Sequence, residues 1–151
     1  MKLLDKAKEI REKFISSLEK TLQNKIILRN DISNNVYEFE EHNLFIYVAV
    51  ISGANTNSVS WRIAENTITK IIKNTTNYVI VFLEKSDMRG YVVDKRDVEH
   101  YMKQKNWQVT EGVKNKGTIS VNKKRFDKER NNFLTSHNEI VFKIKKELEQ
   151  I

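Results

Sequence analysis

The sequence of residues 44–51 is LFIYVAVI, an unbroken apolar run rich in β-branched and aromatic side chains. Its length and composition are typical of a strand that is buried on both faces of a sheet. Two further apolar runs follow, Tyr78–Leu83 and Gly90–Val93, with the turn-forming residues Ser86–Gly90 between them. Together the runs predict the centre of one β-sheet. None of them approaches the roughly 18–20 residues that a membrane-spanning helix needs.

Weaker strand patterns surround this centre. Residues 36–40 have tyrosine and phenylalanine on one face and glutamates on the other, as in a half-buried strand. Residues 107–110 and 118–121 predict two short strands that pair around a glycine-bounded loop. Residues 61–74 have apolar side chains at helical spacing, although the first of them also fit a strand. These patterns predict a β-rich core over residues 36–122.

Amphipathic helices are predicted at both ends of the chain. Residues 2–23 place apolar side chains three or four positions apart and charged side chains between them. Residues 136–151 begin with Ser136 and Glu139, which have the Ser-x-x-Glu spacing of a capping box. An apolar stripe follows on one face of this segment. We therefore expect two helices that flank the β-rich core.

A short helix is predicted inside the core region. Asp94 is suited to cap it, because a carboxylate accepts hydrogen bonds from the free amides of a first helical turn. This helix is expected to end at about Gln104. No linker rich in proline, glycine or serine divides the chain. The order of elements predicts an α+β fold as a single domain over residues 1–151, with a small mixed β-sheet or a pseudobarrel.

Positive charge is concentrated in the second half of the chain. The formal net charge is +7, and residues 101–125 contain seven basic side chains against one acidic side chain, Glu111. A polarised basic domain is typical of proteins that bind a polyanion, most often nucleic acid. The absence of cysteine excludes disulfides, thiolate zinc sites and a cysteine nucleophile, and it fits a reducing compartment. We therefore expect a cytoplasmic protein with a nucleic-acid partner.

Two groups of residues are predicted to bind that partner. The first group lies in and beside the basic region and would grip phosphates: Lys95, Arg96, Lys103, Lys105, Trp107, Lys114, Lys116, Lys123, Lys124 and Arg125. The second group lies on or beside polar loops near residues 53–62 and 86–89 and would recognise bases: Trp61, Arg62 and Arg89. A tryptophan beside an apolar stripe is also typical of a core residue, so both roles remain open for Trp61.

The glycine-bounded loop does not form a nucleotide-binding motif. Gly112 and Gly117 have the spacing of a P-loop, but Thr118 stands where the phosphate-binding lysine belongs. A strand is also predicted where the motif needs a helix. Lys114 and Lys116 in this loop are suited instead to contact nucleic-acid phosphates.

The candidate metal ligands follow no established spacing. The histidines are far apart in the sequence, at His42, His100 and His137. The acidic residues suited to Mg²⁺, which prefers carboxylates and water, are Asp31, Glu38, Glu40 and Glu41. The interpretation that we favour for these acids is a solvated strand face beside a turn. We expect no metal site, no cofactor and no catalytic residue.

The order of several segments is similar to a known nuclease core. The run 44–51 and a polar loop are followed by Trp61–Ile63, then by Tyr78–Leu83 and Gly90–Val93, and then by a predicted helix. Over residues 34–105 this order resembles the core of the PD-(D/E)XK superfamily, the restriction-endonuclease-like proteins. The resemblance implies an acid on one strand and an Asp/Glu-x-Lys motif on the next, which together bind Mg²⁺ and orient the attacking water.

The motif of that superfamily is incomplete in this chain. Glu38 or Glu40 matches the first acid, but residues 44–51 contain neither an acid nor a lysine. No acidic residue in the chain has a lysine two positions further on. The resemblance therefore implies a degenerate core that lacks the catalytic motif.

The basic half of the chain carries a second resemblance. A self-contained, cysteine-free, basic α+β domain with tryptophan and lysine-rich loops is similar in kind to the N-terminal DNA-recognition domains of McrBC- and LlaJI-type restriction systems. This resemblance implies a DNA-binding domain of a restriction-modification or mobile-element system without catalytic activity. Its expected partners are duplex DNA and other subunits or domains of a restriction complex, and no membrane.

Two other functions remain open at this point. One is a divergent Mg²⁺-dependent nuclease that uses Glu38 and Glu40. The other is a protein-interaction module that docks a partner on its terminal amphipathic helices, with the positive charge incidental.

Overall fold

The computed structural model describes residues 3–51, 60–75, 77–84, 89–103, 117–122 and 135–149. Within these residues the chain forms four helices and eight strands. Their order is α1 (Leu3–Leu22), β1 (Ile26–Leu28), β2 (Val36–Phe39), β3 (Leu44–Ile51), β4 (Ser60–Ala64), α2 (Glu65–Asn74), β5 (Asn77–Glu84), β6 (Arg89–Asp94), α3 (Lys95–Lys103), β7 (Thr118–Asn122), β8 (Thr135–Ser136) and α4 (His137–Glu149).

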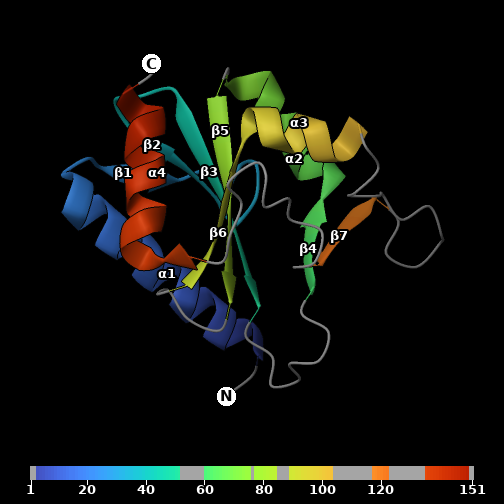
Figure 1. Ribbon diagram of the computed structural model, residues 1–151, viewed down its shortest axis with the longest axis horizontal. Coiled ribbons are helices and arrows are strands. Elements are labelled where there is room, and N and C mark those ends of the chain that lie inside the picture. Colours follow the sequence, from blue (N-terminus) through green and yellow to red (C-terminus); the bar gives the residue numbers. More distant parts are fainter. Residues whose placement is uncertain are drawn as a thin grey trace.

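The strands form two separate sheets (Figure 1). The large sheet has the strand order β1-β2-β3-β5-β6-β8, and β4 and β7 pair as a small sheet of their own. β3 and β5 run parallel over their whole length, from Leu44 opposite Asn77 to Ile51 opposite Glu84, and the other neighbouring strands are antiparallel. The large sheet is mixed and not closed, so the predicted α+β fold is confirmed and the pseudobarrel is not formed.

The two faces of the large sheet are covered by different layers (Figure 1). α1 and α4 pack on one face, while α2, α3 and the small sheet pack on the other. β3 supplies both cores, because successive side chains of a strand point to opposite faces. Leu44 and Ile46 pack with α1 and α4, and Phe45 and Tyr47 pack with the other layer. This two-sided burial explains why the sequence of β3 is continuously apolar.

The helix signals of the sequence are confirmed. α1 and α4 lie within the predicted ranges 2–23 and 136–151. The backbone N–H of Glu139 donates to Ser136 Oγ at 3.4 Å, which is one half of the expected capping box. The backbone N–H of Asp97 donates to Asp94 Oδ1 at 2.8 Å, so Asp94 caps α3 as predicted.

The segment that begins at Trp61 forms both of the structures that its sequence left open. The helix starts only at Glu65, and residues 60–64 form β4. β7 occupies the predicted strand 118–121, and within the described residues its partner is β4. The strand predicted at 107–110 lies outside the described residues. β1 and β8, which are three and two residues long, were not predicted because such short strands leave no recognisable period in a sequence.

In the part of the chain that the structure describes, no helix is long and apolar enough to cross a membrane.

Candidate nucleic-acid interface

The small sheet is an antiparallel ribbon that packs on the α2–α3 side of the large sheet. We call it the β4–β7 ribbon (Ser60–Ala64 and Thr118–Asn122). Its inner residues are almost fully buried, with Trp61 and Ile63 each 1% exposed and Ile119 and Val121 0% exposed. Burial of one such side chain contributes about 1.5–3 kcal/mol. These contacts fix the ribbon to the core as part of the domain.

Hydrogen bonds anchor the ribbon to the two central strands. The indole Nε1 of Trp61 donates to the carbonyl oxygen of Leu83 in β5 at 2.9 Å. The backbone N–H of Ala64 donates to the hydroxyl of Tyr47 in β3 at 3.1 Å. Anchors near both ends of β4 hold its orientation relative to the large sheet.

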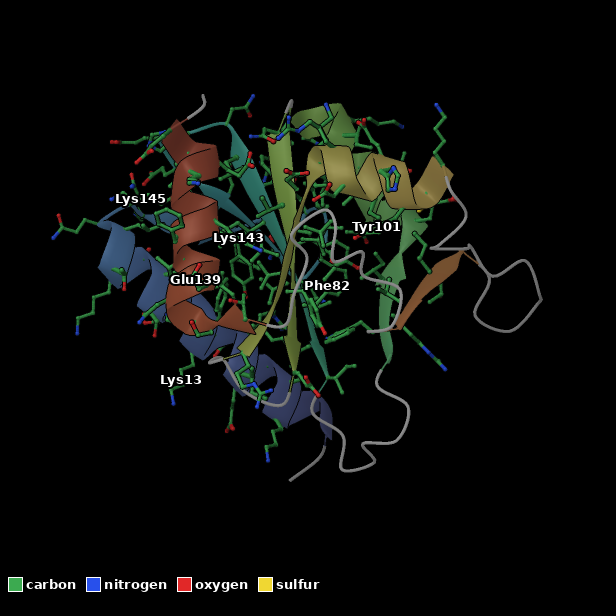
Figure 2. All side chains as sticks on the ribbon, in the orientation of Figure 1. Lys13, Phe82, Tyr101, Glu139, Lys143 and Lys145 are labelled. Atoms are coloured by element: carbon green, nitrogen blue, oxygen red, sulfur yellow. The ribbon has the colours of Figure 1, made fainter. Side chains whose placement is uncertain are left out.

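Trp61 therefore belongs to the core, which corrects its assignment as a base-stacking residue. Its ring makes edge-to-face contacts with Phe82 at 5.4 Å and with Tyr91 at 5.7 Å between ring centroids. Figure 2 shows Phe82 between the large sheet and β4, and Tyr101 beneath α3. A ring with 1% of its surface exposed offers no face to a nucleotide. The alternation of β4 is the physical reason, because Trp61 and Ile63 share its inner face.

Arg62 is exposed in the middle of β4, between the two buried residues. It pairs with Ser120 of β7 in the ribbon register. The sequence placed Arg62 beside a loop, whereas the structure places it on a strand that the core supports.

The helices next to the ribbon carry further cations. Arg96 and Lys103 are exposed on α3, and Lys95 is half-buried at its start. The side chain of Arg96 is 80% exposed and lies 3.6 Å from the Asp94 carboxylate. Such a surface ion pair is worth about 0–1 kcal/mol, so it holds the guanidinium weakly.

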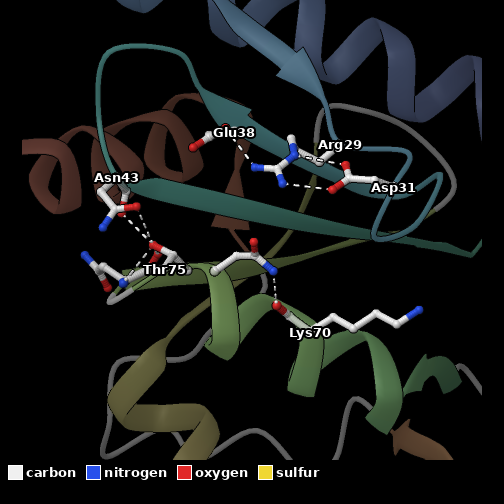
Figure 3. A network of polar contacts seen from close by, with 8 residues as sticks. Arg29, Asp31, Glu38, Asn43, Lys70 and Thr75 are labelled. Atoms are coloured by element: carbon white, nitrogen blue, oxygen red, sulfur yellow. Dashed lines mark hydrogen bonds and ion pairs between the residues drawn. The ribbon is translucent and has the colours of Figure 1, made fainter.

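α2 adds two exposed lysines that the sequence analysis did not select, Lys70 and Lys73. Figure 3 shows the Lys70 side chain extending away from α2. The signal that would have found them is their position on the helix, because the buried residues Ile68 and Ile71 mark the opposite face.

The structure separates Arg89 from the cations of α3. Arg89 is the first residue of β6, and Lys95 directly follows its last residue. Strand geometry puts the two ends of β6 about 17 Å apart. Arg62, Lys95, Arg96 and Lys103 thus belong to one layer of the molecule, and Arg89 lies at the far end of β6.

The remaining predicted site residues lie outside the described residues. They are Lys105, Trp107, Lys114, Lys116, Lys123, Lys124 and Arg125. Their connection to the ribbon is nevertheless clear from the chain order, because residues 104–116 precede β7 and residues 123–134 follow it. Residues 104–134 contain eight basic and three acidic side chains, a net charge of +5 out of the +7 of the whole chain. Most of the net positive charge is therefore carried by segments attached directly to the ribbon.

Three of the four candidate Mg²⁺ ligands, Asp31, Glu38 and Glu40, lie beside cations of the same chain, and Figure 3 shows the first two with Arg29. Arg29 donates two hydrogen bonds to the Asp31 carboxylate, at 2.9 and 3.0 Å, and one to Glu38 at 3.1 Å. Its guanidinium also lies 5.1 Å from the centroid of the Phe45 ring. Glu40 lies 3.9 Å from Lys25. Nowhere in the described ranges do three histidine or acidic side chains come together in a way that would hold a metal ion.

The Arg29 contacts also shift the charge equilibria of the cluster. The hydrogen bond from Arg29 lowers the pKa of Asp31 below its ordinary value. The hydrogen bond to Asp31 likewise raises the pKa of Arg29. Both shifts favour the charged pair, so this cluster acts as an internal ion-pair network at neutral pH.

A polar network fixes the end of α2 to the large sheet (Figure 3). The hydroxyl of Thr75 lies 2.8 Å from the carbonyl oxygen of Asn43 and accepts a hydrogen bond from the N–H of Asn77 at 3.1 Å. These residues directly precede or begin β3 and β5. The network therefore sets the position of the helix that carries Lys70 and Lys73.

Two titratable groups near the start of α3, one buried and one half-buried, have shifted pKa values. Burial raises the pKa of Tyr78 to about 12, and the nearby carboxylates of Glu99 and Asp94 add to this effect. The hydroxyl of Tyr78 is buried without a hydrogen-bond partner. Burial lowers the pKa of Lys143 on α4 (Figure 2), against the opposing effect of Glu139. A phenol with a raised pKa stays protonated at neutral pH and is a poor general base.

Comparisons of the chain with protein-family models, curated proteins and solved structures find no significant match.

Proposed function

We propose that this chain is a non-catalytic, duplex-DNA-binding domain of a restriction or mobile-element system, active in the cytoplasm. The observation that carries the proposal is the attachment of the most basic part of the sequence to one anchored ribbon. Residues 104–134 have a net charge of +5, and β7 lies within them. A phosphate backbone is the polyanion that such a concentration of lysine and arginine fits best.

The distribution of charge over the other elements supports the same surface. α1 and α4 together have eight basic and seven acidic residues, a net charge of +1. β4, α2 and α3 have six basic and three acidic residues, a net charge of +3. The helices of the opposite layer, α1 and α4, are thus nearly neutral. The elements of the layer that contains the ribbon are positively charged, in addition to the positive charge of residues 104–134.

The absence of catalysis is supported by the surroundings of Glu38. This carboxylate is hydrogen-bonded to Arg29, and the adjacent strand β3 contains no acid and no lysine. A divergent Mg²⁺ nuclease would need this carboxylate free to bind metal. The protein-interaction alternative is less favoured because Phe14 and Leu18 of α1 and Ile140 and Ile144 of α4 pack against the chain's own sheet.

The test is a binding titration with duplex DNA, single-stranded DNA and duplex RNA, with and without Mg²⁺. We expect the duplex-DNA affinity to fall steeply as salt increases, with no requirement for metal and no cleavage product. Failure of the wild-type protein to bind duplex DNA at low salt would overturn the proposal. Metal-dependent cleavage would replace it with the nuclease.

A further inference from the structure

The two strands of the β4–β7 ribbon have an unusual composition. Residues 61 and 63 of β4 and residues 119 and 121 of β7 are the buried inner positions. Arg62 lies between the two buried residues of β4 and is exposed, and the sequence has Ser60, Ser120 and Asn122 at the other alternating positions. The ribbon strands contain no acidic residue. In the register, Ser60 pairs with Asn122 and Arg62 pairs with Ser120.

These residue types are the ones that recognise base edges. Arginine forms a bidentate pair with guanine, asparagine forms one with adenine, and serine bonds to either base. A two-stranded antiparallel ribbon also fits the width of the major groove of B-form DNA. We infer that the outward face of the β4–β7 ribbon enters the major groove of duplex DNA, with Arg62 recognising a base at its centre.

The ribbon has the rigidity that base recognition requires. It is fixed to β5 through Trp61 and to β3 through Ala64, as described above. The N–H of Glu65 also donates to the carbonyl oxygen of Gly117 at 2.9 Å, which ties the start of α2 to the start of β7. Gly117 has a φ of 79°, a conformation that glycine adopts at no steric cost. A hydrogen-bonding group on a fixed strand is positioned more accurately than one on a loop.

Charge complementarity supports DNA as the occupant of this face. The ribbon itself is uncharged apart from Arg62. In the sequence, Lys114 and Lys116 precede β7, and Lys123, Lys124 and Arg125 follow it. A strand without charge between basic segments of the sequence suits a groove whose floor is made of base edges and whose rims are phosphates.

Strand geometry predicts the size of the recognised site. Residues two apart on a strand are separated by about 7 Å, and base pairs are spaced by about 3.4 Å. The positions two residues before and two residues after Arg62 are therefore about 14 Å apart, which corresponds to about four base-pair steps. This inference rests on the proposed function and moves base recognition from the loops near 53–62 and 86–89 to the ribbon.

The experiment selects duplexes from a random DNA pool and compares the selected duplex with a scrambled duplex and with an RNA duplex of the selected sequence. Arg62→Ala should lose about 5- to 150-fold in affinity for the selected duplex and less than about threefold for the scrambled one. The matched control is Arg96→Ala, an exposed arginine on α3, which should weaken both DNA duplexes alike. Thermal melts check that both variants are folded.

The outcomes separate this inference from the proposed function. If the wild type binds no duplex DNA, both the inference about the ribbon and the proposed function are wrong. If it binds but enriches no short motif, or if Arg62→Ala weakens both DNA duplexes alike, the ribbon does not recognise bases and only the proposed function stands. Equal affinity for the RNA duplex would also overturn the inference, because side chains cannot enter the deep, narrow major groove of A-form RNA.

Discussion

The indole Nε1 of Trp61 donates a 2.9 Å hydrogen bond to the carbonyl oxygen of Leu83. The two residues are 22 positions apart and belong to different sheets. This bond links the ribbon to the end of β5, and the burial of the same indole closes the core beneath the ribbon. A side chain that looked like a nucleotide-stacking candidate in the sequence is thus the main structural support of the candidate interface.

Trp61 should therefore be essential for stability. Trp61→Ala removes a fully buried indole and should cost about 3–5 kcal/mol in the free energy of unfolding. Trp61→Phe keeps an aromatic ring but leaves the Leu83 carbonyl without its donor, which should cost about 1–3 kcal/mol. Denaturant titration measures both values. Arg62→Ala, the exposed neighbour, should stay within about 0.5 kcal/mol of the wild type, and an equally stable Trp61→Ala would contradict the core assignment.

The dependence of DNA affinity on salt concentration should be determined mainly by the basic segments that precede and follow β7 in the sequence. Each lost phosphate contact flattens the slope of log K against log salt by about 0.9 for duplex DNA. The quadruple glutamine variant of Lys114, Lys116, Lys123 and Lys124 should therefore show a much flatter slope.

The control for this measurement removes the same number of charges from the opposite layer. Lys6, Lys8, Lys13 and Lys20 of α1, changed together to glutamine, should leave the slope near that of the wild type. Equal slopes for the two quadruple variants would mean that net charge, rather than a defined surface, drives binding.

Removal of the acidic strand residues should not impair DNA binding. Glu38 and Glu40 are paired with Arg29 and Lys25, and neither belongs to the basic layer. The Glu38→Ala, Glu40→Ala double variant should keep its affinity for duplex DNA or gain slightly, because repulsion of phosphates is reduced. The assay compares binding and cleavage in the presence of Mg²⁺. Metal-dependent nicking by the wild type that disappears in this variant would show the two glutamates to be catalytic.

The hydroxyl of Tyr78 should destabilise the fold. It is buried without a hydrogen-bond partner, so Tyr78→Phe should raise stability by about 1 kcal/mol. The pKa of Tyr78 is raised to about 12 from an ordinary value near 10. Between about pH 10 and 12 the unfolded chain loses the phenol proton while the folded chain keeps it, so the free energy of unfolding does not depend on this group below about pH 10 and falls as the pH rises towards 12. Alkaline unfolding should therefore be steeper in the wild type than in Tyr78→Phe, and identical pH curves would contradict the burial of the phenol.

The Arg29–Asp31 pair should give the fold an acid-sensitive contribution. The pKa of Asp31 is lowered in the folded chain, so its contribution to stability is complete above about pH 4 and is lost as the pH falls through the folded value. Asp31→Asn should consequently flatten the loss of stability between about pH 5 and pH 2. Unfolding curves measured across this range test the expectation. A pH profile unchanged by Asp31→Asn would show that the pair contributes nothing in solution.

The sequence by itself determined the centre of the sheet and the flanking helices. Residues 44–51 were predictable as a strand covered on both faces, because eight consecutive apolar side chains leave no face for water and their β-branched and aromatic content favours a strand. The cap at Asp94 was likewise predictable, since the hydrogen bond that forms it spans only three residues. Such signals depend only on residues that are close together in the sequence, so they can be recognised without knowing the tertiary contacts.

Only the tertiary structure decided which side chains share a surface. The segment from Trp61 onward fits both a strand and a helix, and its pairing with β7, almost sixty residues later, made its first part a strand. That pairing turned Trp61 inward and Arg62 outward. The length of β6 in turn separated Arg89 from Lys95, although the sequence places them only six residues apart. Strand partners and burial are set by contacts between distant residues, so the candidate site could not be assembled from the local pattern alone.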